Sequence, residues 1–152
     1  MAAAPVEACR LALVLALDVS SSVDAEEDQL QRYGLAAALR APEVEAAFFS
    51  APEPVAIQIF EWSGQRNQTD LLDWTLIRTP ADLFLAANTL TQSKRSINDM
   101  PTAIGYALGY ASIKLKEAPA CLFQTIDVAG DGINNDGFAP QRLPMLPFLS
   151  MG

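Results

Sequence analysis

Two apolar stretches constrain the fold of this chain more than any other feature: residues 10–17, which are nearly unbroken, and residues 121–129, which are mostly apolar. Neither is long enough to span a membrane as a helix, which takes roughly 18 apolar residues or more. Each is instead typical of a strand that is buried on both faces of a parallel sheet, where the alternation of polar and apolar residues is lost. The first stretch leads to Asp18, which is followed by Val19 and three serines, and the second leads to Asp131, which lies in a Gly-Asp-Gly sequence. The sequence therefore predicts an α/β fold built around these two strands.

The chain between the two stretches divides into helices and strands by its local patterns. An acidic turn that begins at Asp24 favours a helix start, because carboxylates are stabilised at the positive end of the helix dipole. A second start is marked by Thr79 as the N-cap, Pro80 at the first helical position and Asp82 as the partner of the cap. We expect helices over residues 24–40 (with Pro42 at the exit), 80–92 and 101–116, and a hairpin of strands over residues 55–62 and 71–77. This order predicts a Rossmann-like open sheet, mostly parallel with one antiparallel edge strand, with helices on both faces.

The composition changes after residue 137. Residues 138–152 contain three prolines, which rule out a regular helix or a central strand there. We therefore expect residues 1–137 to form one domain and residues 138–152 to form a proline-rich apolar tail. The strand over residues 121–129 then remains as an edge of the sheet. We expect the isolated chain to cover that edge as a symmetric homodimer.

The net charge and the residues that are missing exclude several classes of function. The chain has a formal net charge of −8, so it lacks the basic surface that nucleic acids and anionic membranes require. It contains no histidine, which excludes Ser-His-Asp and Cys-His catalysis and histidine-ligated zinc, and its two cysteines are too few for a thiolate zinc site. Any bound metal is expected to be a hard cation that is held by oxygen atoms. We expect no nucleic-acid partner and no membrane span.

Oxygen-bearing side chains gather at the positions where such a cation would bind. Open α/β sheets bind ligands outside the carboxyl ends of their strands, and Asp18 begins the pattern Asp-x-Ser-x-Ser there, with Ser20 and Ser22. Asp131 lies in a Gly-Asp-Gly sequence after the other buried strand, and Thr102 lies in the first turn of the last expected helix. Carboxylate and hydroxyl oxygens suit Mg²⁺ or Mn²⁺. With only two carboxylates the ion would keep one position open, which an external carboxylate can fill.

Three segments of the chain resemble the von Willebrand factor A (VWA) domain in the order and spacing of that family. They are Leu-Val-Leu-Ala-Leu-Asp-Val-Ser-Ser-Ser at residues 13–22, Pro-Thr-Ala-Ile-Gly-Tyr-Ala-Leu at 101–108 and Ile-Asp-Val-Ala-Gly-Asp-Gly at 126–132. The resemblance covers roughly residues 10–137, and within this fold the chain is similar to a group of uncharacterised bacterial exported proteins. The family implies a sheet order of 3-2-1-4, normally continued by two further strands. The proline-rich tail can supply neither of them, so we expect a domain that is truncated at its carboxyl end.

The resemblance also implies a metal-ion-dependent adhesion site (MIDAS). In this site Ser20 and Ser22 would bind the metal directly, Asp18 and Asp131 directly or through water, and Thr102 would change between these two modes as a ligand arrives. The implied function is that of a module that binds a protein ligand in adhesion or assembly. An acidic side chain of the partner would complete the coordination of the metal, and no enzymatic activity is implied.

Each motif also has a simpler interpretation. The residues from Asp18 onward could cap the following helix, and Gly-Asp-Gly could be only a tight turn, which would leave a metal-free scaffold of the same fold. The rival from another class is a Mg²⁺-dependent phosphatase of the haloacid dehalogenase type, which also has aspartates after its first and fourth strands. Such enzymes resemble Asp-x-Asp at the first of these positions. Here Ser20 replaces the second aspartate and cannot act as an acid or base at neutral pH, so the sequence favours a binding module.

The two cysteines stand at matching positions in the two buried strands. Cys9 lies nine residues before Asp18, and Cys121 lies ten residues before Asp131. If both aspartates meet at one end of adjacent parallel strands, the cysteines must lie close together at the other end, because each strand rises by about 3.3 Å per residue. We therefore predict a disulfide and, with it, a periplasmic or secreted location. The alternative is a pair of buried free thiols in a cytosolic protein.

Overall fold

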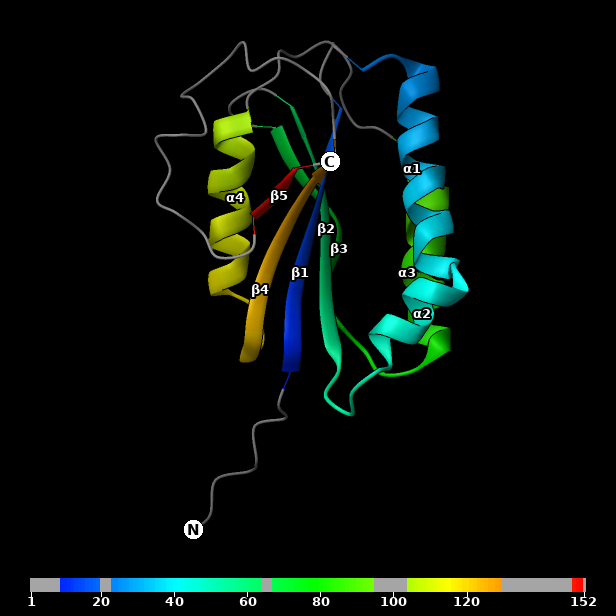
Figure 1. Ribbon diagram of the computed structural model, residues 1–152. Helices are drawn as coiled ribbons and strands as arrows, with labels where there is room; N and C mark the ends of the chain where they lie inside the picture. The colour runs from blue at the N-terminus through cyan, green and yellow to red at the C-terminus, as the bar shows by residue number, and fades with distance from the viewer. Residues whose placement is uncertain (1–8, 20–22, 64–66, 95–103, 130–148, 152) are drawn as a thin grey trace.

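The computed structural model describes residues 9–19, 23–63, 67–94, 104–129 and 149–151, and it shows one open sheet between two layers of helices (Figure 1). The described strands are β1 (Cys9–Asp18), β2 (Val55–Ser63), β3 (Asn67–Ile77), β4 (Cys121–Ala129) and β5 (Leu149–Met151). The described helices are α1 (Ala25–Arg40), α2 (Pro42–Phe48), α3 (Pro80–Gln92) and α4 (Ile104–Lys116). The sheet has the order β3-β2-β1-β4-β5, in which β2 and β3 pair antiparallel and the other neighbours pair parallel. The α/β class and the order 3-2-1-4 that the sequence implied are therefore confirmed.

β1 lies inside the sheet, and this position explains its unbroken apolar sequence. It pairs with β2 on one side and with β4 on the other. Leu15 and Leu17 belong to a core cluster with residues of α1 and α3, whereas Val14 and Ala16 belong to a second cluster with residues of α4 (Figure 1). Both faces of the strand are thus buried, as is usual for parallel strands between layers of helices.

Two of the helix starts that the sequence predicts have a side-chain cap, and the cap at Thr79 was itself expected. Asp24 caps α1, since its carboxylate accepts from the Glu27 backbone at 2.8 Å and Glu27 Oε2 accepts from the Asp24 backbone at 2.9 Å. Thr79 and Asp82 form the same reciprocal pair at α3. The N-cap of α1 is Asp24, so Asp18 is not needed for capping. Within the described residues, no helix is both long and apolar enough to cross a membrane.

Two local expectations differ from the structure. Pro42 does more than mark the end of the first helix, because it is the first residue of the short helix α2, where a missing backbone N–H has little consequence. β3 begins at Asn67 rather than at residue 71, because its polar start is held by pairing with the end of β2. The last expected helix is described only from Ile104 onward, since residues 101–103 lie outside the described part of the chain.

The carboxyl-terminal tail supplies a strand, which its prolines had led us to exclude. The segment Leu149–Met151 pairs in parallel with Ile126, Asp127 and Val128 of β4. This segment begins beyond the last proline of the sequence, so proline removes no donor from the paired residues. The expectation that β4 forms an open edge along its whole length is therefore wrong. The expected homodimer could form only along the part of β4 that precedes Ile126, which β5 does not pair with.

A disulfide joins Cys9 to Cys121, as predicted. The two residues are register partners at the amino ends of β1 and β4, and their Cα atoms are 4.2 Å apart. Neither cysteine is a free thiol. The bond spans 112 residues of sequence and fixes the first strand to the strand that follows α4.

Candidate functional site

β1 ends at Asp18, which is completely buried at the carboxyl edge of the sheet. Asp18 is the register partner of Trp62 in β2, and the backbone N–H of Val19 donates to the Trp62 carbonyl at 2.9 Å. On the other side, Leu17 pairs with Ala129, the last residue of β4. The carboxyl ends of three parallel strands thus meet at Asp18, and this is the edge from which open α/β sheets bind ligands.

The other expected metal ligands lie outside the described residues; they are Ser20, Ser22, Thr102 and Asp131. The two residues that border residues 20–22 in the sequence, Val19 and Val23, are both buried. Within the described ranges, no group of three or more histidine, cysteine or acidic residues could hold a metal. The expected ligand set contains only two carboxylates and does not depend on such a group. Asp18 itself, a buried oxygen donor at this edge, fits a hard cation.

Two further polar groups are buried at the end of β2, next to Asp18. The indole Nε1 of Trp62 and the hydroxyl of Ser63 have no hydrogen-bond partner among the described residues, and both residues are 0 % exposed. Such groups are rare in folded proteins and require a water, an ion or a further segment of the chain to complete them. This edge of the sheet is therefore more polar than the apolar sequence of β2 suggests.

A buried ion-pair network lies on the side of the sheet that α1 and α3 cover. Arg32 of α1 is 3 % exposed, and its Nε atom donates to both carboxylate oxygens of Asp28, at 3.1 and 2.9 Å. Its Nη2 atom donates to Glu61 Oε2 of β2 at 2.6 Å, and its Nη1 atom donates to Ser93 Oγ at 2.7 Å. Burial opposes the charged form of Arg32, but the hydrogen bonds to Asp28 and Glu61 outweigh it, so the pKa of Arg32 is raised.

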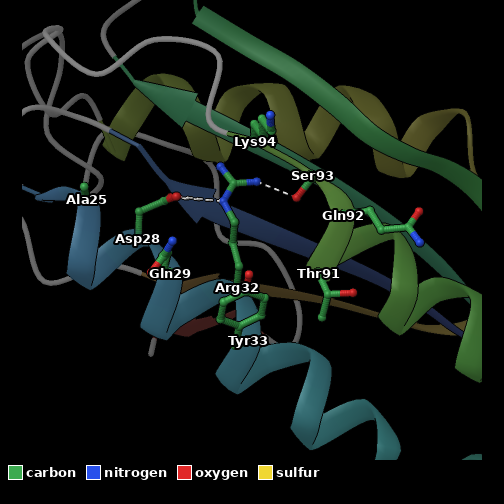
Figure 2. Close-up of a pocket in the computed structure, with 9 residues that line it drawn as sticks. All are labelled: Ala25, Asp28, Gln29, Arg32, Tyr33, Thr91, Gln92, Ser93 and Lys94. Carbon is green, nitrogen blue, oxygen red and sulfur yellow. Dashed lines mark hydrogen bonds and ion pairs between the residues drawn. The ribbon is translucent and has the colours of Figure 1, made fainter.

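This network borders a pocket of about 280 Å³ between α1 and the end of α3 (Figure 2). Arg32 and Tyr33 line the pocket from α1, and Thr91, Ser93 and Lys94 line it from the end of α3. Its lining thus combines an aromatic ring, hydroxyl groups and two basic side chains. Asp18 is not among the described residues that line this pocket.

A second polar network holds α4 against the sheet. Asp70 of β3 accepts hydrogen bonds from Gln58 Nε2 and from the Tyr110 hydroxyl, both at 2.9 Å, and it pairs with Lys114 Nζ at 2.7 Å. The hydrogen bond to Asp70 is the main cause of the raised pKa of Lys114, whereas burial is the main cause of the raised pKa of Tyr110. α4 follows Thr102 in the sequence, so this network sets the position of the helix that leads away from the candidate site.

Neither network was expected from the sequence, although two signals for the first one were present. Asp28 and Arg32 have the spacing of neighbours on one face of a helix, and Glu61 interrupts an otherwise apolar strand. A buried carboxylate requires a partner, so a basic residue on the helix that covers this face could have been sought for Glu61. The sequence does not say which basic residue that is.

Comparison with known families places the chain among its relatives. Residues 8–145 match a family model that is described as protein of unknown function (DUF1194). The chain belongs to this family. The DUF1194 match includes all five expected metal ligands and both cysteines. No curated protein is similar enough in sequence to add a closer relative.

Solved structures similar to this DUF1194 chain include proteins from animals and bacteria. Proximal thread matrix protein 1 from the mussel byssus has a TM-score of 0.64 and 16% identity, over 88% of this chain and 34% of that chain. A second structure of that protein, with a zinc-occupied MIDAS motif, has a TM-score of 0.57 and 19% identity, over 84% of this chain and 30% of that chain. The PilB minor pilin from Streptococcus sanguinis has a TM-score of 0.60 and 16% identity, over 82% of this chain and 30% of that chain.

The vWF domain of the type V pili tip protein Mfa5 from Porphyromonas gingivalis is also similar, with a TM-score of 0.52 and 16% identity, over 83% of this chain and 39% of that chain. Together these likenesses show that the DUF1194 chain has a VWA-like fold, as its three motifs implied. At such low identity they show the fold alone. The chain spans about a third of the length of the structures that it matches.

Proposed function

We propose that the chain is a protein-binding module of the adhesion or assembly type that depends on a divalent metal. The ion would be Mg²⁺ or Mn²⁺, and its ligands would be Asp18, Ser20, Ser22, Thr102 and Asp131. The observation that carries the proposal is the burial of Asp18 where the carboxyl ends of β1, β2 and β4 meet. A carboxylate at this edge, followed in the sequence by two alternate hydroxyl groups, suits a hard cation.

The chain's own residues support the candidate site from within the fold. Gln31 Nε2 donates to the Asp18 carbonyl at 2.7 Å, which fixes the end of β1 to α1. The two carboxylates of the site would balance the charge of a divalent cation and no more. The bound cation would therefore keep an open, electrophilic coordination position for an acidic side chain of the partner. Asp18 and Asp131 would hold the site together as the partner binds and leaves.

The similar structures support a role in binding. They belong to a byssus matrix protein, a minor pilin and a pilus tip protein, and one of them has a zinc-occupied MIDAS motif. In this chain the lack of histidine and the pairing of both cysteines favour Mg²⁺ or Mn²⁺ over zinc. The disulfide and the pilus proteins among the similar structures support a periplasmic or secreted location.

The proposal predicts that Mg²⁺ or Mn²⁺ raises the melting temperature of the chain, because a ligand of the native state stabilises it by mass action, by about 2.7 kcal/mol at 100 times Kd. Asp18→Asn keeps the shape of the side chain and removes its charge, so it should abolish the rise. Asp73→Asn removes the same charge from an exposed position of β3, and Ser21→Ala changes a serine with no assigned metal contact. Both controls should respond as the wild type does in thermal unfolding with each ion and with EDTA.

The outcomes separate the proposal from its alternatives. An Asp18→Asn chain that responds to metal like the wild type would refute the ligand assignment. A wild-type chain that responds to neither ion would favour the metal-free scaffold, and turnover of a phosphomonoester that is lost in Asp18→Asn would favour the phosphatase. A protein that is retained by the immobilised chain in Mg²⁺ and released by EDTA would be the partner.

A further inference from the structure

We propose that Arg32 is a positioning residue for the candidate metal site. It links α1, which follows residues 20–22, to the carboxyl end of β2 beside Asp18 and to Ser93, the C-cap of α3, which precedes the segment that contains Thr102. The inference rests on the proposed function, because it concerns the same site. None of the four side chains of the network is itself an expected ligand; they are Asp28, Arg32, Glu61 and Ser93.

Two adjacent residues fix α1 to the carboxyl edge of the sheet. Gln31 reaches β1 through the Asp18 carbonyl at 2.7 Å, and Arg32 reaches β2 through Glu61 Oε2 at 2.6 Å. β1 and β2 are neighbours, and Glu61 lies one residue before the register partner of Asp18. These two hydrogen bonds, which lie beside Asp18, therefore fix the rotation of α1 and its position along the sheet. Residues 20–22, which include two expected ligands, connect the two elements that these bonds hold together.

The same guanidinium fixes the point at which the chain leaves α3 (Figure 2). Nη1 of Arg32 donates to Ser93 Oγ at 2.7 Å, and Ser93 is the C-cap of α3. Ser93 Oγ in turn donates to the Leu90 carbonyl at 2.7 Å, and the Ser93 backbone N–H donates to the same carbonyl at 3.2 Å. The serine is thus held both by its own helix and by Arg32. Thr102, an expected ligand, follows nine residues later in the sequence.

The energetics favour a role in position over a role in stability. Replacing buried ion pairs by apolar side chains of similar volume is often neutral or stabilising, so stability alone does not explain the burial of Asp28, Arg32 and Glu61. The guanidinium is planar and has five N–H donors in fixed directions, so it holds three acceptors in one arrangement. The three ionic side chains together carry a formal charge of −1, and a negative charge close to the site favours a cation there.

Ser93→Ala tests the link in a protein whose buried charges stay paired. It removes the acceptor of Arg32 Nη1 and leaves the ion pairs of Arg32 with Asp28 and Glu61 in place. Thr91→Ala is the matched control. Its hydroxyl also donates to the carbonyl three residues earlier, at 3.1 Å, but it accepts nothing from Arg32 among the described residues.

We expect Ser93→Ala to bind Mg²⁺ or Mn²⁺ roughly tenfold more weakly than the wild type, the lower limit for residues that support metal ligands. Thr91→Ala should bind as the wild type does. Isothermal titration calorimetry measures the affinity for each ion, and urea unfolding in EDTA measures the stability of each metal-free chain. Ser93→Ala should lose more stability than Thr91→Ala, because it leaves a donor of the buried Arg32 without its acceptor, but both chains should be folded under the conditions of the titration.

The outcomes distinguish a failure of this inference from a failure of the proposed function. If the wild type binds metal and Ser93→Ala binds it as tightly as Thr91→Ala does, Arg32 has no positioning role and the proposed function stands. An Arg32→Lys chain with wild-type affinity would lead to the same conclusion, because lysine keeps the charge but not the planar fork. A wild-type chain that binds neither ion would overturn the proposed function and this inference with it.

Discussion

Asp127 places a carboxylate inside the sheet, in β4, where it pairs with residues of β1 and β5. Burial raises the pKa of this carboxyl group, because the charged form loses hydration. Asp28 and Glu61 are more deeply buried, but the guanidinium of Arg32 binds both of them. At the scale of single residues, the cost of a buried carboxylate in this protein thus depends on its partner as well as on its depth.

Asp127→Asn should therefore stabilise the chain at neutral pH. The pKa of Asp127 is raised in the folded state, so its contribution to stability is present below the unfolded pKa and is lost as the pH rises through the folded pKa. The asparagine variant does not ionise, so its advantage should be present at about pH 7 and should shrink as the pH falls toward about 4. Urea unfolding across this range, with the exposed Asp73→Asn as a control, measures the difference. An advantage that stays constant with pH would contradict the prediction.

Asp18 could be identified from the sequence because it stands at the end of an unbroken apolar stretch, where a buried strand reaches the edge of its sheet. Arg32 could not be identified in this way. Its partners Glu61 and Ser93 are 29 and 61 residues away, and contacts over such separations depend on how α1 packs against β2 and α3. The local signal, Asp28 four residues before Arg32, is equally typical of an exposed pair on a helix surface.

At the scale of the elements, the helix caps act locally. Thr79→Ala removes the hydroxyl that accepts from the Asp82 backbone, and it should lower the free energy of unfolding by about 1 kcal/mol, as is usual for an N-cap. Thr89→Ala is the matched control in the same helix, where the hydroxyl donates to the Leu85 carbonyl. Alanine is the better helix former there, so this change should cost nothing. Urea unfolding compares the two variants, and equal losses would show that the cap makes no specific contribution.

The elements that could be predicted are those that the local sequence determines, namely the capped helices and the buried strands β1, β2 and β4. The start of β3 could not be predicted, because Asn67 and the residues after it are polar and become a strand only by pairing with β2. β5 depends in the same way on β4. Pro42 was ambiguous for a different reason, since proline is compatible both with the end of one helix and with the start of the next.

At the scale of the whole molecule, the sheet separates two core clusters, and the disulfide fixes β1 to β4 at the end of the sheet opposite Asp18. Replacing both Cys9 and Cys121 with serine should lower the free energy of unfolding by about 2–4 kcal/mol, because the unfolded chain regains the freedom of a long loop. The response to Mg²⁺ should persist, since the change lies far along β1 from Asp18. Urea unfolding with and without dithiothreitol measures the effect. Dithiothreitol should lower the free energy of unfolding of the wild type and should not affect the double variant. A double variant that is as stable as the wild type without dithiothreitol would contradict the prediction.

β1 is made before both of its neighbours in the sheet, β2 and β4. Its partner β4 begins 112 residues after Cys9, a delay on the order of ten seconds at typical rates of translation. Until then the strand can pair only with β2, and Cys9 remains a reactive thiol. An oxidant that acts during this interval cannot form the native bond, because Cys121 has not yet been made. The timing of oxidation, and not only its extent, therefore decides how much of the newly made chain reaches the native pairing.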